Sequence, residues 1–106
     1  QATELGNYEV DTWLNWAEIL CECDELEAAE VVLRQGCEFH PESAELQYQL
    51  AGVYLRQHFP DKGKRTLQKA LKEAPDKYPY FETRFPEISR ALWVQRLLRE
   101  SGKASK

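Results

Sequence analysis

The chain has 106 residues, of which 42% are hydrophobic and 30% are charged, and its formal net charge is −4. This length suffices for one compact domain, and the composition excludes both a disordered chain and a fibrous one. No stretch approaches the roughly 18 uninterrupted apolar residues of a membrane helix, so we expect a soluble domain without membrane contact and favour the cytoplasm.

A period of 34 residues runs through most of the chain. Pro41 and Pro75 lie 34 positions apart, and six further pairs share this offset and keep large residues opposite large ones and small opposite small. These pairs are Trp16 and Leu50, Ala17 and Ala51, Leu20 and Tyr54, Ala29 and Gly63, Leu33 and Leu67, and Gly36 and Ala70. Such self-similarity is typical of stacked helical repeats, in which each copy buries its apolar face against the next.

Each copy is expected to form two helices. In the first copy the large residues Trp13, Trp16 and Leu20 are three and four positions apart, which is helical spacing. Asp24 followed by Glu27 resembles a capping box and predicts the start of the second helix. The small residues at the shared positions predict helices whose backbones approach closely.

The two copies, residues 10–43 and 44–77, resemble the tetratricopeptide repeat, whose signature is W-x2-L-G-x2-Y, then A-x3-F, then P. The first copy reads Trp13-x2-Trp16-Ala17-x2-Leu20, then Ala29-x3-Leu33, then Pro41. The second reads Gln47-x2-Leu50-Ala51-x2-Tyr54, then Gly63-x3-Leu67, then Pro75. The resemblance implies an all-α fold, a right-handed alpha-alpha superhelix (a TPR solenoid) of two helical hairpins with a C-terminal capping helix, in one domain over residues 1–106.

The period stops after the second copy. Arg84 and Phe85 occupy the places that correspond to Leu50 and Ala51, and Pro86 follows at once. We predict an aromatic connector over residues 78–85, serving either as a binding loop or as a cover for the core, then a closing helix over 86–100 and a disordered tail over 101–106. The residues expected on one stripe of the closing helix are Ile88, Leu92, Gln95 and Leu98.

Tetratricopeptide repeats commonly bind an extended peptide or a helix of a partner protein on the concave surface formed by the first helix of each hairpin. The resemblance therefore implies a protein or peptide ligand here. The groove positions that it implies are Asp11, Leu14, Asn15, Glu18, Cys21, Glu22, Glu45, Tyr48, Gln49, Gly52, Leu55 and Arg56. Tyr48 and Leu55 have a second interpretation, in which they only pack against a neighbouring helix. Since Leu14, Glu18 and Gln49 replace the residues with which chaperone-binding members clamp a carboxylate, we expect no such clamp.

Charge is divided along the chain. Residues 1–50 contain 12 acidic and 1 basic side chains, whereas residues 51–106 contain 6 acidic and 13 basic ones. The acidic half favours a basic partner. A basic stripe follows in the second half, formed by Lys62, Arg65, Lys69 and Lys72. We interpret it as a solvated face and expect no nucleic acid as partner, a nucleic-acid-binding repeat being the least favoured alternative.

No set of residues predicts catalysis, a cofactor or a metal site. Glu18 and Glu22 share a helical face, but such pairs in an acidic helix are usually only solvated. On a helix Cys21 and Cys23 point too far apart to share a zinc ion, and the odd number of cysteines favours free thiols. Because about three repeats are normally needed for a stable stack, we keep a second hypothesis: a module that self-associates through exposed solenoid ends, or a fragment of a longer repeat protein.

Overall fold

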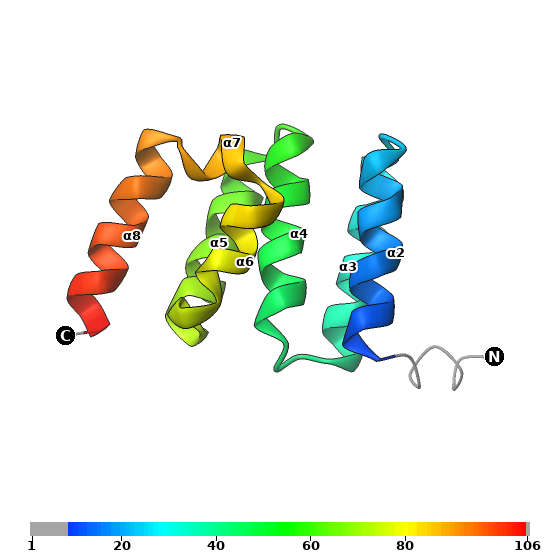
Figure 1. Ribbon diagram of the computed structural model, residues 1–106, viewed down its shortest axis with the longest axis horizontal. Coiled ribbons are helices and arrows are strands. Elements are labelled where there is room, and N and C mark those ends of the chain that lie inside the picture. Colours follow the sequence, from blue (N-terminus) through cyan, green and yellow to red (C-terminus); the bar gives the residue numbers. More distant parts are fainter. Residues whose placement is uncertain (1–8, 106) are drawn as a thin grey trace.

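The computed structural model describes residues 9–105, with side chains described as far as residue 100. Within these residues the chain is helical and contains no strand (Figure 1). The elements are α2 (Val10–Glu22), α3 (Leu26–Phe39), α4 (Ala44–Arg56), α5 (Pro60–Glu73), the 3-10 turn η1 (Pro75–Lys77), α6 (Tyr78–Arg84), α7 (Pro86–Ser89) and α8 (Leu92–Ser105). None of these helices combines the length and the apolar character that crossing a bilayer requires.

Helices α2 and α3 form one antiparallel hairpin, and α4 and α5 form the next (Figure 1). Both hairpins turn in the same way. Asp24 and His58, one period apart, have positive φ angles of 64° and 69°. After each, a backbone N–H reaches back to the preceding helix: Glu25 N donates to Leu20 O at 2.8 Å. Phe59 N donates to Tyr54 O at 2.9 Å in the second hairpin. This left-handed residue with a long backward bond is a common way to end a helix.

The capping box expected at Asp24 is wrong. The N-cap of α3 is Glu25, and no side chain caps this helix end. Asp24 instead occupies the left-handed position after α2, a conformation that Asp tolerates better than most residues. Pro60 begins α5, a position that suits proline because its missing N–H loses no hydrogen bond in the first helical turn.

Two connected clusters of buried side chains form the core. Trp13 is fully buried at the centre of the first cluster, and Tyr48 and Phe81 are fully buried in the second. The small residues of the repeat bring the helices together: Ala17, Ala29 and Ala51 are fully buried, and a Cβ at Gly63 would collide with Leu55. The alternation of large and small residues therefore sets the distance between helices.

The aromatic connector expected over residues 78–85 is a helix, α6. Its buried residues Tyr78 and Phe81, together with Phe85 just beyond it, are spaced three and four apart and form one apolar stripe. Pro79 lies in the first turn, where helices accept proline. The aromatic residues therefore cover the core, one of the two roles expected for this segment, and they do so from a helix that continues the stack.

The closing helix expected over residues 86–100 is interrupted. Helix α7 ends at Ser89, and Gln95 Nε2 donates to Ser89 O at 2.6 Å, which satisfies a carbonyl at the break. The break changes the buried stripe, so that Leu92 is 87% exposed while Val94 and Leu97 are buried. Helix α8 then extends to Ser105, which contradicts the disordered tail expected for residues 101–105; Lys106 lies outside the described residues.

Candidate partner-binding site

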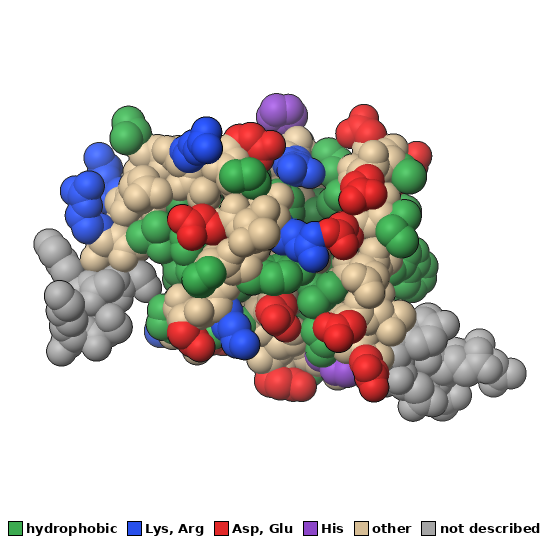
Figure 2. Space-filling view, viewed as in Figure 1, with side chains coloured by type: hydrophobic (Ala, Val, Ile, Leu, Met, Phe, Trp, Pro, Cys, Tyr) green, Lys and Arg blue, Asp and Glu red, His purple; other side chains and the backbone are tan. Residues whose placement is uncertain are grey.

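A polar stripe runs along α2, on the side of the molecule that α2 and α4, the first helices of the two hairpins, form. Asp11, Asn15, Glu18 and Glu22 are four, three and four positions apart, so they share one side of the helix. Asp11, Asn15 and Glu22 are exposed, and Glu18 is half-buried. Figure 2 shows acidic side chains along α2 on this face. We refer to these four residues as the α2 stripe.

The groove positions on α4 lie beneath α6 and its neighbouring residues. Tyr48 is fully buried, Gln49 is 2% exposed and Gly52 is buried. Tyr80 of α6 donates its hydroxyl hydrogen to Gln49 Oε1 at 3.0 Å. The Phe85 ring lies so close to Gly52 that a Cβ there would overlap it. The chain's own aromatic residues therefore cover the groove positions expected on α4.

Other groove positions differ in exposure. Leu14 is buried in the first core cluster, whereas Glu45, Leu55 and Arg56 are half-buried. Tyr48 donates its hydroxyl hydrogen to Ala74 O at 2.7 Å, so it ties α4 to the end of α5. Leu14 and Tyr48 therefore contribute to packing in this structure, and they are not accessible to a partner while α6 stays in place.

A hollow of about 180 Å³ remains between α2, α4 and α6. It is lined by Glu18, Cys21, Glu22, Gln49, Arg56, Arg84 and Phe85. Glu18 and Arg84 form an ion pair across it. Arg56 lies 4.8 Å above the centre of the Phe85 ring, and its guanidinium is 3.8 Å from a carboxylate oxygen of Glu87. Four predicted site residues and Cys21 thus meet in one charged depression.

Tyr80, Arg84 and Phe85 lie in the segment expected to be a binding loop or a cover for the core, but the sequence did not indicate that they contact α2 and α4. The available signal was the three-and-four spacing of residues 78, 81 and 85, which predicts a helix rather than a connector. Once α6 is a helix placed after α5, its polar and aromatic side chains reach α4 and its terminal arginine reaches α2.

Burial raises the pKa of two titratable groups of the groove, a phenol and a thiol. It raises the pKa of the Tyr80 phenol, and the nearby carboxylates of Glu45 and Asp11 raise it further. Burial also raises the pKa of the Cys21 thiol, partly offset by Arg56. A thiol with a raised pKa is a poor nucleophile at neutral pH. The hollow therefore offers charges and hydrogen bonds for recognition.

Comparison with known proteins gives one match. The family model for the tetratricopeptide repeat matches residues 10–52, and neither a curated protein nor a solved structure matches the chain. Tetratricopeptide repeats are in general non-catalytic modules for protein interaction. The all-helical hairpins with a 34-residue period agree with the match. Residues 10–52, which span α2, α3 and the first part of α4, are therefore similar to the tetratricopeptide repeat.

Proposed function

We propose that this protein binds a basic segment of a partner protein, held by the α2 stripe at the open edge of the concave face. The observation that carries the proposal is the ion pair between Arg84 and Glu18. Here a guanidinium from α6 is already accommodated by a carboxylate of the groove. An arginine or lysine of a partner would use the neighbouring carboxylates in the same way.

The remaining carboxylates of this surface are available for such contacts. Among the described residues, Asp11, Glu22 and Glu45 take part in no salt bridge. Asp11 and Glu22 are eleven positions apart on α2, which is about 16 Å along the helix axis because each residue advances an α-helix by about 1.5 Å. An extended peptide covers this distance with about five residues at about 3.3 Å each. An extended partner segment of this length with several basic side chains can therefore contact both carboxylates.

The buried groove positions have a different role in this proposal. Tyr48, Gln49 and Gly52 hold α6 in the groove, and the partner lies beside α6 along α2. Arg56 lines the hollow and limits how far the partner extends, whereas Leu55 packs against Gly63 of α5.

A titration with a defined peptide tests the proposal. We expect an acetylated, amidated octapeptide of alternating Arg and Ala to shift the ¹⁵N amide resonances of α2. Because exposed ion pairs contribute little individually, Asp11→Asn with Glu22→Gln should weaken binding by about 3- to 10-fold.

The matched control is Glu25→Gln with Glu27→Gln, which removes two exposed carboxylates away from the stripe. It should change the affinity less than twofold. Equal weakening by both double variants, or equal binding of an octapeptide with Gln in place of Arg, would refute the proposal.

A second candidate function, self-association, is favoured by the apolar surface of the first hairpin. Trp16, Ile19 and Phe39 are 40%, 58% and 42% exposed, and Trp16 and Phe39 both stack on the buried Trp13. Such residues fit against a further helical pair, either in a second copy or in an adjoining repeat. Sedimentation equilibrium should show a dimer that Trp16→Gln with Ile19→Gln dissociates. If the chain stays monomeric at all concentrations up to about 0.5 mM, self-association is ruled out in that range.

A further inference from the structure

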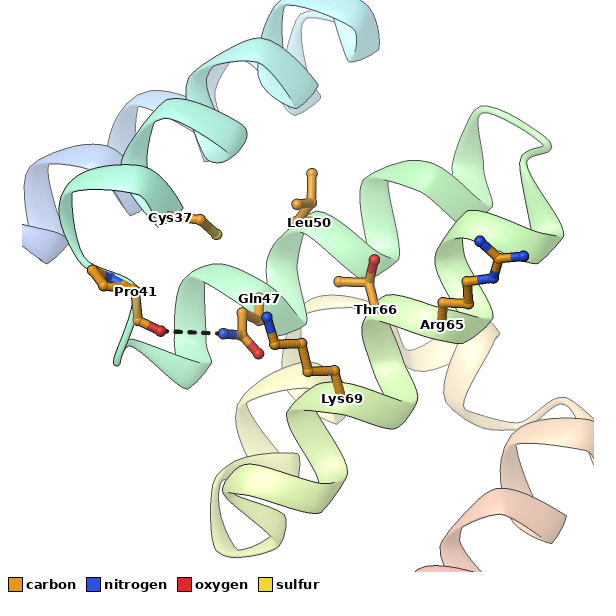
Figure 3. Close-up of a pocket in the computed structure, with 7 residues that line it drawn as sticks. All are labelled: Cys37, Pro41, Gln47, Leu50, Arg65, Thr66 and Lys69. Atoms are coloured by element: carbon orange, nitrogen blue, oxygen red, sulfur yellow. Dashed lines mark hydrogen bonds between the residues drawn. The ribbon is translucent and has the colours of Figure 1, made fainter.

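A second cleft lies between the two hairpins, away from the hollow described above (Figure 3). Its volume is about 290 Å³. The lining residues come from the end of α3, the following loop, α4 and α5: Cys37, Pro41, Gln47, Leu50, Arg65, Thr66 and Lys69. None of the seven is acidic, and two are basic, so the cleft attracts anions.

The two cations are exposed and stand one helical turn apart. Arg65 and Lys69 are four positions apart on α5 and both line the cleft, with Lys69 directed toward Gln47 and Arg65 directed away from it (Figure 3). Neither takes part in a salt bridge with another described residue. Lys62, which precedes them on this face, instead lies over the rings of Tyr54 and Phe59 at 5.8 and 5.2 Å. The cleft therefore holds two cations that are available to a ligand.

Gln47, at the floor of the cleft, has a side-chain oxygen that needs a hydrogen-bond donor. It is only 6% exposed, and its Nε2 donates to Pro41 O at 3.4 Å. Its Oε1 is buried, and no donor among the described residues reaches it. In Figure 3 Lys69 points toward this amide. A buried acceptor without a donor is unfavourable, so a ligand that brings an N–H is favoured here.

The remaining walls are uncharged. Leu50 is 8% exposed, and Cys37 is half-buried. Burial raises the pKa of the Cys37 thiol to about 11, although Lys69 lowers it, so this side chain stays neutral at pH 7. The cleft thus combines a small apolar wall, two cations and one acceptor.

We propose that this cleft binds an extended acidic segment of a partner protein. Glu or Asp carboxylates of the segment pair with Arg65 and with Lys69, and a backbone N–H of the segment donates to Gln47 Oε1. A peptide supplies both kinds of group. The phosphodiester of a nucleic acid supplies only acceptors, so a base or a ribose would have to supply the donor to Gln47 Oε1, whereas every non-proline residue of a peptide backbone carries an N–H. The partner is therefore opposite in charge to the one proposed for the α2 stripe, and the two sites are independent.

The test uses an acetylated, amidated octapeptide of alternating Glu and Ala, added to the ¹⁵N-labelled full chain. We expect resonance shifts at residues 65–69 and at the Gln47 side-chain amide. Arg65→Gln with Lys69→Gln should weaken binding by about 5- to 30-fold, because two partly shielded ion pairs are lost. Lys64→Gln with Lys72→Gln is the control with the same change of charge on exposed positions of α5 outside the lining, and it should change the affinity less than twofold.

A second variant tests the role of the acceptor. Gln47→Met keeps the side-chain length but removes the carbonyl. It should weaken binding of the peptide by about 3- to 10-fold, while the far-ultraviolet circular dichroism spectrum stays unchanged. If this variant does not fold, the two charge variants decide the question alone. Equal weakening by both charge variants, no binding at millimolar peptide, or tighter binding of an oligothymidylate to the same residues would overturn the proposal. None of these outcomes affects the arginine-peptide test of the α2 stripe.

Discussion

The contact between Gly52 and Phe85 gives the sharpest prediction about how α6 occupies the groove. An added Cβ at residue 52 would overlap three carbons of the Phe85 ring. Overpacking of this kind costs about 1–3 kcal/mol. Alanine also gains about 1 kcal/mol of helix propensity over glycine, which offsets part of the cost. We therefore expect Gly52→Ala to lower the free energy of unfolding by about 0–2 kcal/mol.

A double-mutant cycle separates these two effects. In a Phe85→Ala background the collision is absent, so Gly52→Ala should raise the free energy of unfolding by up to about 1 kcal/mol. The coupling between the two sites should then be about 1–3 kcal/mol, measured by urea denaturation and circular dichroism. For a domain of this size 1 kcal/mol corresponds to a shift in Tm of about 4–8 °C. If Gly52→Ala had the same effect in both backgrounds, the Phe85 ring would not lie on α4, and the description of the filled groove would fail.

Three further predictions follow from the site and the core. Tyr80→Phe removes the donor to Gln49 Oε1, which is almost fully buried, so it should cost about 1–3 kcal/mol in urea denaturation, whereas Thr83→Ala, at an exposed hydroxyl of the same helix, should cost less than about 1 kcal/mol. Burial raises the pKa of Tyr48 and Tyr80 in the folded state above the ordinary value of about 10, so the unfolded chain loses these protons first. The contribution of the two phenols to stability should be constant below about pH 10 and be lost above it, which pH-dependent thermal melts of the parent and of Tyr48→Phe with Tyr80→Phe measure. Iodoacetamide should label the exposed Cys23 before the half-buried Cys37, whose pKa is raised to about 11, and peptide mass spectrometry measures this order; faster labelling of Cys37 would contradict its burial.

The repeat could be predicted from the sequence because it depends on the volumes of the side chains at matching positions. Ala17 and Ala51 are fully buried between helices, and their pairing at one offset is visible without coordinates. The turn at Asp24 could not be predicted in the same way. Asp followed three positions later by Glu fits a helix start, yet Asp also tolerates the left-handed conformation. In the structure Asp24 adopts the left-handed conformation.

The segment after the second copy was harder to recognise as helical, because the 34-residue period stops there, with Arg84 and Phe85 at the positions that correspond to Leu50 and Ala51. Pro79 and Pro86 each lie in the first turn of a helix, where they break no hydrogen bond. The same error affected the site. The α2 stripe lies on one helical face as expected, but the cover over Tyr48, Gln49 and Gly52 comes from residues about 30 positions later. Their placement depends on the packing of α6, which no local pattern of α4 reveals.

The shared geometry of the two hairpin turns bears on how the protein can be lengthened. Asp24 and His58 adopt the same backbone conformation one period apart. Residues 24–57 therefore contain both helices that pack between the two hairpins, α3 and α4. Inserting extra copies of residues 24–57 at His58 would extend the stack by complete modules while reusing an existing turn. Stability in such arrays grows with every added interface between neighbours. The turn at His58 is thus a suitable insertion site for building longer repeat arrays from this chain.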